Sequence, residues 1–176
     1  TQEMMAYLKG DRESLRVITT IEGESQDFFN EQDRFHMKEV QTLFLGGLKL
    51  RTGAVIVFFL CVFWLVICLP KGRWISVLCR SYQGTLSVVL VLFLILGIRA
   101  AYDFNTLFVQ FHELFFDNDL WIFDPAEDYM IRMLPEGLFF DFVFRIGGFF
   151  VAGLFGIFII TIFLRVIYKK ISDTYE

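Results

Sequence analysis

Two histidines, His36 and His112, are the only imidazole side chains in this chain of 176 residues. The unperturbed pKa of histidine lies near neutrality, so two imidazoles that face one substrate can accept and donate a proton at working pH. The first lies in FHMKEV and the second in FHELFF, so each has an aromatic neighbour and a nearby carboxylate. This pattern permits acid–base catalysis by histidine. The alternative is that each histidine is an isolated interfacial or core residue.

Other types of catalytic centre have less support in the sequence. His112 and Glu113 begin like the zinc-protease pattern HExxH, but Phe116 stands where the second histidine belongs, which disfavours a histidine-rich zinc site. Ser14 and Ser25 lie in polar contexts without the GxSxG pattern of a serine nucleophile. Glycine-rich phosphate loops are absent outside the apolar runs. We therefore expect neither a metal nor a cofactor.

The elements that must position the histidines are dominated by membrane-spanning segments. Hydrophobic residues make up 56% of the chain, whereas soluble proteins average about 45 to 50% apolar residues. These residues gather in three runs long enough to cross a hydrocarbon core of roughly 30 Å. We predict an all-α integral membrane protein with this division: an extracellular cap segment and pre-span helix over 1–51, a transmembrane helix over 52–69, a cytoplasmic loop over 70–81, a transmembrane helix over 82–102, an extracellular cap or re-entrant segment over 103–142, a transmembrane helix over 143–166 and a cytoplasmic tail over 167–176.

Charged connections set the predicted orientation, because short cytoplasmic loops collect Lys and Arg. Between the first two runs, Lys71, Arg73 and Arg80 occur with no acid. Residues 103–141 instead hold nine acids against the single base Arg132. Both histidine-bearing segments are therefore predicted on the outer side of the membrane, and the charge balance argues against a nucleic-acid partner.

The cysteines, Cys61, Cys68 and Cys79, all fall in the first run or on the predicted inner side. A covalent thioester mechanism at the outer side would need a thiol there, so this mechanism is disfavoured. Cys61 and Cys68 are two helical turns apart and could share a metal, although packing is the simpler interpretation.

The first outer segment is predicted to divide at Gly10, after residues 3–9 at the end of a helix. Residues 15–21 are rich in β-branched side chains and bounded by charged, Gly and Ser residues, which favours a short strand or extended piece. From Asn30, apolar residues recur at three- and four-residue steps into the first span. This pattern predicts a helix that carries His36 just above the membrane.

The second outer segment is unusually aromatic for a solvated loop. Between residues 103 and 141 it holds ten aromatic residues: Phe104, Phe108, Phe111, Phe115, Phe116, Trp121, Phe123, Tyr129, Phe139 and Phe140. Their density suggests re-entrant or interfacial helices at the bilayer surface. Asp124, Pro125 and Glu127 form a capping-box-like helix start, and Pro135 should end that helix.

The segment FHELFFDNDLWIFDPAEDYMIRMLPEGLF, preceded upstream by FHMKEV, resembles the integral membrane family that contains the lipoprotein intramolecular transacylase Lit of Gram-positive bacteria. The resemblance covers nearly the whole chain, including Pro135 and Glu136 before the last span. It implies four transmembrane helices with an extracellular cap, so we expect a further span at the N-terminal side. It also implies two essential histidines near the interface of cap and membrane, at His36 and His112.

The activity implied by this resemblance is acyl transfer within one diacylated bacterial lipoprotein at the cell membrane. The sn-2 acyl chain of the diacylglyceryl-cysteine moves to the α-amino group of the same cysteine, giving a lyso-form lipoprotein. The pKa of an α-amine is near 8, so a histidine can accept its proton at modest cost. One histidine would accept the ammonium proton while the other, protonated, donates to the tetrahedral or departing oxygen, without an acyl-enzyme. The sequence does not assign the two roles.

Several other residues are expected to support this site. Glu39, one turn beyond His36, could orient it or belong to an ordinary surface pair. Asn118 could donate to an oxyanion, although a turn role within residues 117–119 is the simpler interpretation. The remaining supporting residues are the aromatic wall for acyl and glyceryl groups and the pair before the last span: Phe111, Phe115, Phe116, Trp121, Pro135 and Glu136. The aromatic members could equally be interfacial packing residues.

Two other functions stay open on the sequence. The first is a lipid or lipoprotein hydrolase in which a histidine activates water. The second is a non-catalytic membrane subunit whose outer cap binds a partner.

Overall fold

The structure is a computed structural model that describes three stretches of the chain: 2–21, 23–69 and 72–174. It divides into two compact units. The first unit comprises Thr1–Ala54 and Asn105–Phe139, and the second comprises Val55–Phe104 and Phe140–Glu176. Both histidines belong to the first unit.

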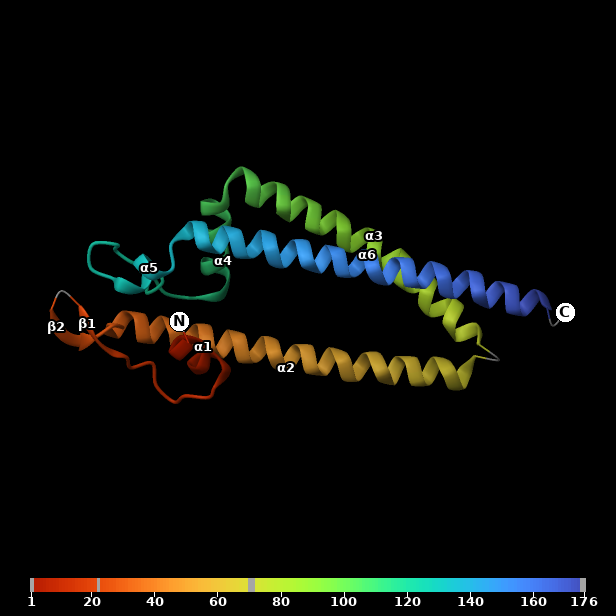
Figure 1. Cartoon of the computed structure of the whole chain (residues 1–176), viewed down its shortest axis with the longest axis horizontal. Helices are drawn as coiled ribbons and strands as arrows, with labels where there is room; N and C mark the ends of the chain where they lie inside the picture. The colour runs from red at the N-terminus through yellow and green to blue at the C-terminus, as the bar shows by residue number, and fades with distance from the viewer. Residues whose placement is uncertain (1, 22, 70–71, 175–176) are drawn as a thin grey trace. The chain divides into compact units, whose positions relative to one another are not determined.

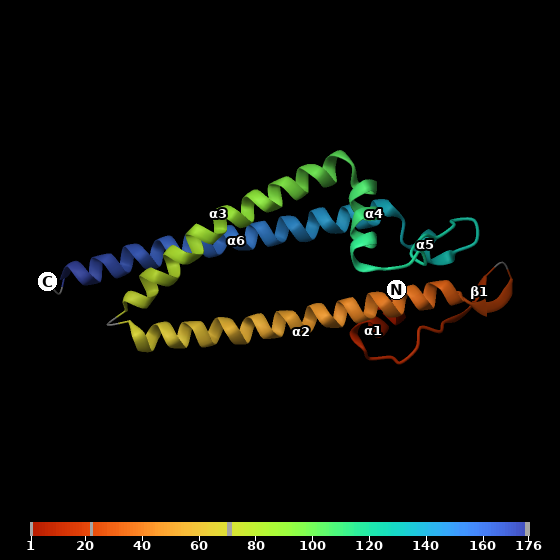
Figure 2. The same cartoon turned by 180° about the vertical axis from the view of Figure 1, so that it is seen from behind.

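The chain is mostly helical, as Figures 1 and 2 show from opposite sides. In chain order the elements are α1 (Gln2–Lys9), β1 (Ile18–Ile21), β2 (Glu24–Asp27), α2 (Glu31–Cys68), α3 (Arg73–Tyr102), α4 (Phe104–Phe115), α5 (Tyr129–Met133) and α6 (Glu136–Thr174). The predicted all-α class therefore needs one correction, because the described residues include a two-stranded hairpin.

That hairpin pairs β1 and β2 antiparallel, with Ile18 opposite Asp27. The extended piece predicted over 15–21 is confirmed for its last four residues. The second strand, ESQD, was missed because it lacks the β-branched and aromatic residues that favour strands. Gly23, directly before β2, has a φ of +91°, a value that glycine adopts without the strain of a Cβ.

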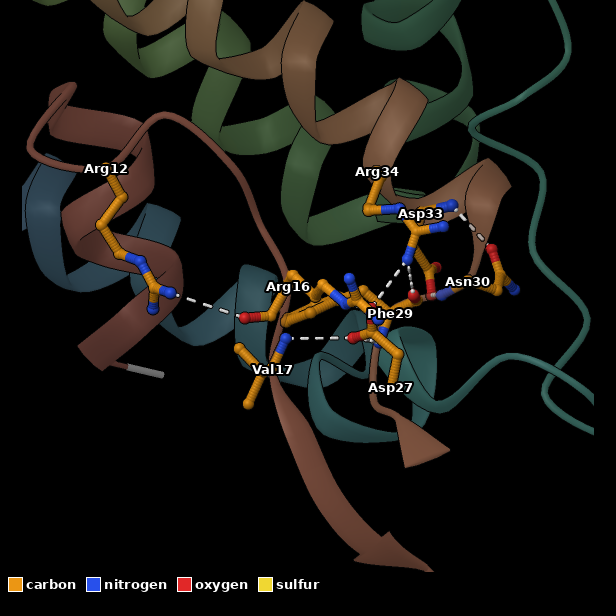
Figure 3. Close-up of polar contacts among 8 residues, drawn as sticks. All are labelled: Arg12, Arg16, Val17, Asp27, Phe29, Asn30, Asp33 and Arg34. Atoms are coloured by element: carbon orange, nitrogen blue, oxygen red, sulfur yellow. Dashed lines mark hydrogen bonds and ion pairs between the residues drawn. The ribbon is translucent and has the colours of Figure 1, made fainter. Parts of the chain in front are cut away.

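The carboxylate of Asp27 joins the hairpin to the segment that leads into α2 (Figure 3). Its Oδ1 accepts hydrogen bonds from the backbone N–H of Val17, at 3.0 Å, and of Phe29, at 3.3 Å. Its Oδ2 accepts from Nη1 of Arg34 at 2.9 Å, and the same nitrogen donates to the Phe29 carbonyl at 2.6 Å. One side chain thus fixes the strand, the turn after it and the first turn of α2.

The N-terminus of α2 is closed by a reciprocal pair of side-chain caps. The backbone N–H of Asp33 donates to Oδ1 of Asn30 at 2.8 Å, and the backbone N–H of Asn30 donates to Oδ2 of Asp33 at 2.9 Å. This is the capping-box arrangement, which satisfies backbone N–H groups that have no partner inside the helix. It explains why the helix begins where the pattern from Asn30 predicted.

α2 continues without interruption for 38 residues. At about 1.5 Å per residue it is roughly 57 Å long, nearly twice the hydrocarbon thickness of about 30 Å. The predicted span over 52–69 occupies its apolar C-terminal half, and His36 lies near its polar N-terminus. His36 therefore lies outside the predicted span.

Within the described residues, three helices are long and apolar enough to cross a membrane: α2, α3 and the Glu136–Tyr168 part of α6. This supports a multi-pass membrane protein. Residues 73–81 of the predicted cytoplasmic loop over 70–81 are helical, because α3 already begins at Arg73. Pro70 and Lys71 of that loop lie outside the described residues. α6 likewise continues through most of the predicted tail over 167–176.

In the second unit, α3 crosses α6 (Figures 1 and 2). Polar side chains tie the two helices within this apolar unit. The Tyr82 hydroxyl donates to the Leu154 carbonyl at 2.6 Å. Gln83 donates to Oγ1 of Thr161 at 3.1 Å and accepts from Nη1 of Arg165 at 2.6 Å. Each polar group is thereby hydrogen-bonded where water is scarce.

The first unit has its own apolar core. Its buried members come from α1, α2, α5 and the segments around the hairpin: Met4, Tyr7, Leu15, Phe29, Met37 and Met130. The predicted helix end before Gly10 is confirmed, since α1 ends at Lys9. α1 is also tied to α2 by a hydrogen bond from Gln41 to the Tyr7 carbonyl. The core places the N-terminal half of α2 between α1 and the chain around α5.

The helix predicted to start at Asp124 begins later. Oδ1 of Asp124 accepts from the backbone N–H of Ala126 at 2.8 Å, and the Asp124 N–H donates to Oδ2 of Asp128 at 2.7 Å. These bonds close a turn instead of a helical cap, and α5 begins at Tyr129. The predicted helix end at Pro135 agrees with the structure.

Replacing Asp27 by alanine should loosen the hairpin locally while the long helices persist. The backbone N–H groups of Val17 and Phe29 lose their acceptor, at a cost of about 1–3 kcal/mol. Hydrogen–deuterium exchange of the whole protein in detergent measures this as faster exchange of peptides covering 15–30. Glu24→Ala, an exposed acid in the same strand, is the matched control and should exchange like wild type. Unchanged protection in Asp27→Ala would contradict the role assigned to this carboxylate.

Candidate active site

The two imidazoles lie side by side in the first unit, His36 on α2 and His112 on α4. Their ring centroids are 5.9 Å apart and their planes differ by 31°. His36 is 6% exposed and His112 is 9% exposed. The charge pattern predicted a shared side of the membrane and the family resemblance implied a shared site; in the structure the two rings lie within reach of one reacting group.

Two of the predicted wall residues enclose this pair. The Phe116 ring lies 5.0 Å from the His36 ring and 5.6 Å from the His112 ring. The Trp121 ring lies 4.9 Å from His112. Phe116 is itself buried, so it separates both imidazoles from solvent.

Two further aromatic residues were not predicted as part of the site. The Phe108 ring lies 4.2 Å from His112, and the Phe123 ring lies 5.5 Å from His36. The contact between Phe108 and His112 could have been predicted from the sequence, because Phe108 precedes His112 by four residues and shares its helix face. No sequence pattern predicted the contact between Phe123 and His36, since the approach of Phe123 to α2 depends on how the chain folds back after α4.

Phe111 and Phe115, the other two Phe residues predicted as wall residues on α4, are more exposed than Phe116. Phe111 is 47% exposed and Phe115 is 48% exposed. Their rings contact each other at 4.8 Å, and Phe111 meets His112 edge-on at 5.5 Å. Among the ring contacts of the described residues, Phe115 touches no imidazole. With Leu114, 76% exposed, the two rings give α4 an outward apolar face.

A backbone hydrogen bond fixes the tautomer of His112. Its Nδ1 lies 2.7 Å from the Phe108 carbonyl oxygen. A carbonyl only accepts, so Nδ1 carries the hydrogen and the lone pair is on Nε2. Burial lowers the pKa of His112, and the bond to Phe108 partly opposes this effect because it favours the charged ring. His112 therefore offers an oriented, uncharged nitrogen base.

His36 is harder to protonate. Burial, and then the repulsion from a charged His112, lower its pKa from 6.5 to about 4. Its Nδ1 is buried and has no hydrogen-bond partner among the described residues. Since both pKa values are lowered, both rings favour the uncharged form at neutral pH.

Glu39 and Asn118, predicted as supporting residues, hydrogen-bond to each other. Nδ2 of Asn118 donates to Oε1 of Glu39 at 2.8 Å, while Oδ1 of Asn118 accepts from the backbone N–H of Leu120 at 3.0 Å. The turn role of Asn118 is thus confirmed. Among the hydrogen bonds of the described residues, Glu39 makes none to His36, so the expected orienting contact is not present.

A second acid on the same helix is fully buried. Asp33 has 0% exposure, and its Oδ1 has no hydrogen-bond partner among the described residues. Burial first, and then the charge of Asp128, raise the pKa of Asp33 to about 6, against a lowering by the backbone bond at Asn30. This carboxyl was not singled out from the sequence, because its burial depends on the packing of the chain near α5.

Pro135 and Glu136 lie at the junction of α5 and α6, and both are exposed. Oε2 of Glu136 accepts from Nδ2 of Asn105 at 3.3 Å. In the contacts of the described chain, neither residue touches an imidazole, so the structure gives them a connecting position. The described residues also contain no group of three or more His, Cys, Asp or Glu side chains placed to hold a metal ion.

The low basicity of His36 can be measured directly, because selective ¹⁵N labelling of histidine marks only two rings. We expect His36 to stay neutral down to about pH 5, with a pKa near 4. In His112→Gln its pKa should rise, since the repulsion is removed while burial remains. Glu113→Gln changes an exposed charge beside His112 and should leave the His36 titration almost unchanged. A wild-type His36 pKa near 6.5 would show that the ring is solvated.

Comparisons with known proteins agree on one family. The family model described as "Lipoprotein intramolecular transacylase Lit" matches residues 1–140, which contain both imidazoles and the rings around them. A similar solved structure is the in meso structure of the membrane integral lipoprotein intramolecular transacylase Lit from Bacillus cereus. It has a TM-score of 0.66 and 20% sequence identity, over 99% of this chain and 71% of that chain. At this identity the likeness shows a shared fold. No curated protein matches the chain.

Proposed function

Because this chain belongs to the lipoprotein intramolecular transacylase family Lit, we propose that it moves an acyl chain within one lipoprotein molecule. The acyl chain leaves the sn-2 oxygen of a diacylglyceryl-modified N-terminal cysteine and is transferred to the α-amino group of the same cysteine. The observation that carries this proposal is the pair of uncharged imidazoles, 5.9 Å apart within an aromatic enclosure. An ester bearing an acyl chain suits such an enclosure better than a polar substrate does.

His112 acts as the base. The free amine attacks the ester carbonyl carbon, and the nitrogen becomes positively charged and strongly acidic in the tetrahedral intermediate. Nε2 of His112 takes one proton from that nitrogen. The imidazolium is supported by its Nδ1–H bond to the Phe108 carbonyl, which becomes stronger when the ring is charged.

His36 acts as a neutral hydrogen-bond donor. With a pKa near 4 it keeps one N–H and no charge at neutral pH. A neutral imidazole can stabilise an oxyanion without giving up its proton, and such donors typically contribute about a hundred- to a thousandfold in rate. The same low pKa makes His36 a poor base, so the two rings are not interchangeable.

The second half of the reaction returns the proton. The bond between the carbonyl carbon and the glyceryl oxygen breaks, and the His112 imidazolium protonates that oxygen. The products are an amide at the cysteine nitrogen and a free sn-2 hydroxyl. No atom is gained or lost overall, and no acyl-enzyme forms.

The enclosure also favours transfer over hydrolysis. The imidazoles are 6% and 9% exposed, so bulk water has little access to the reacting carbon. The amine, in contrast, is tethered to the ester in one molecule, and such alignment is worth about 7 to 11 kcal/mol in favourable systems. We place this site at the extracellular interface, because the basic connections predicted inside support that orientation.

Alanine substitution of either histidine should abolish most of the transfer. We expect His112→Ala to lower kcat by about a hundred- to ten-thousandfold and His36→Ala by about a hundred- to a thousandfold. Mass spectrometry of a diacylated lipopeptide provides the assay, because transfer conserves mass while shifting the acyl group to the amine. Leu114→Ala, at an exposed side chain of α4, is the control and should retain near wild-type activity.

The same assay separates the other functions. A lipid or lipoprotein hydrolase would add water and release a fatty acid. A membrane subunit without catalysis would give no product in wild type or in any variant. Full transfer by well-folded His36→Ala or His112→Ala would contradict the assigned roles.

The pH dependence distinguishes the base from the donor. In wild type, kcat/KM should rise with pH toward the amine pKa near 8, because only the free amine attacks. Under saturating substrate, kcat should follow deprotonation of the bound amine and fall further at acid pH as His112 becomes protonated, below its usual pKa of 6.5. His36→Gln should lower kcat across the range and leave its acid limb in place. Loss of that limb in His36→Gln would mean that His36 is the base.

A further inference from the structure

One buried oxygen beside the imidazoles has no partner. Oε2 of Glu39 is inaccessible to solvent and makes no hydrogen bond among the described residues, whereas Oε1 is held by Asn118 at 2.8 Å. Glu39 follows His36 by three residues on α2, so the two side chains are neighbours on the helix surface. The carboxylate is thus anchored through one oxygen and unsatisfied at the other.

Such an oxygen calls for a physical explanation. A buried acceptor without a donor costs roughly 1–3 kcal/mol, and more when it is charged. Asp33 Oδ1 and His36 Nδ1 on the same helix are likewise buried without a partner. The three atoms follow one another at three-residue steps, so the unsatisfied groups gather along one side of α2, next to the imidazole pair.

We propose that Oε2 of Glu39 binds the α-amino nitrogen of the substrate and positions it for attack. This inference rests on the proposed function and specifies which end of the lipoprotein is recognised. None of the hydrogen bonds and ion pairs of the described residues brings a cation to this oxygen, and the substrate N-terminus supplies one. A charge-assisted hydrogen bond from an ammonium group to a carboxylate is stronger than one between neutral groups.

The number of N–H groups fits the reaction. The nitrogen carries two hydrogens in the tetrahedral intermediate. One is taken by Nε2 of His112 and the other donates to Oε2 of Glu39. These two contacts hold the nitrogen next to the ester carbon with which it forms the new bond. Glu39 keeps its charge throughout and transfers no proton, so it is a positioning residue.

The anchoring of Glu39 supports this role. Asn118 is itself fixed by its bond from the Leu120 N–H, so the carboxylate is held from a turn and not by a mobile surface side chain. Among the described residues, no third His, Cys, Asp or Glu joins it to form a metal site. Because aromatic rings cover the imidazoles, substrate binding must displace some of these side chains before the amine reaches the carboxylate.

The test compares two ligands that cannot react. Both are lipopeptides with ether-linked chains in place of the esters; one carries the α-amino group and the other has hydrogen in its place. The wild-type protein in detergent should bind the amine ligand about ten- to a hundredfold more tightly at pH 7. In Glu39→Gln that preference should fall to near unity, while affinity for the ligand without the amine stays the same. Glu113→Gln, which removes an exposed charge beside His112, should keep the preference.

The outcomes separate this inference from the proposed function. Equal binding of both ligands by wild type, together with continued transfer of the ester substrate, would overturn the role of Glu39 and leave the transacylase proposal standing. A preference for the amine ligand without any transfer would support the binding site and refute the proposed reaction.

A kinetic measurement adds a readout that a merely structural role would not change. A carboxylate beside an ammonium group raises the pKa of that group. Under saturating substrate, kcat rises with pH as the bound amine loses its proton. In Glu39→Gln this rise should therefore occur at lower pH, and KM should increase. A reduced kcat with an unshifted limb would indicate that Glu39 only supports the fold.

Discussion

Two imidazoles can share a dry enclosure only while neither is charged. Burial removes the water that would solvate an imidazolium, and a charge on one ring repels a charge on the other. In this chain the two effects act unequally. His112 keeps a backbone carbonyl as a partner for one nitrogen, whereas His36 has a nitrogen without any partner in the described chain. An almost symmetric pair thereby acquires two different environments, and the proposed roles of base and donor rest on that difference.

The same constraint explains why the site needs a firm framework. An unsatisfied ring nitrogen is tolerated only where surrounding interactions prevent the side chain from turning to water. The N-terminal half of α2 is held by the apolar core on one side and by the Asn30–Asp33 caps at its end. Asp27 ties the hairpin to that same end. The polar bonds cluster at the start of α2 because its first backbone groups lack helical partners.

The sequence predicted the parts of this protein that depend on local patterns. The apolar runs predicted three spans, and the three- and four-residue steps predicted the helix that carries His36. Elements and contacts that depend on partners outside their own segment were missed. The β2 strand exists because its backbone pairs with β1 and Asp27 finds donors outside the strand. Phe123 meets His36, and Asn118 meets Glu39, only after the chain between α4 and α5 folds back onto α2. No short-range spacing encodes those contacts.

The family resemblance indicated that the two histidines act together, and the structure shows how their hydrogen-bonding environments differ. The motifs around them are alike in composition, each with an aromatic residue directly before the histidine. The two motifs differ in how they use the backbone carbonyl four residues before the histidine. The carbonyl of Phe108 accepts a hydrogen bond from His112. Backbone acceptors are present at every residue, so the sequence alone could not indicate which ring would use one.

The buried carboxyl of Asp33 has a consequence for acid tolerance. For His36 the folded-state pKa is about 4 and the unfolded value is 6.5, so its contribution to stability is lost as pH falls across that window. For Asp33 the folded-state pKa is about 6 and the unfolded value is 3.8, so its contribution grows as pH falls. Between about pH 4 and 6 the unfolded chain binds an extra proton at the imidazole, and the folded chain binds one at the carboxyl. The two linkages have opposite sign, so the Asp33 carboxyl offsets part of the stability that the buried imidazoles of His36 and His112 lose on mild acidification.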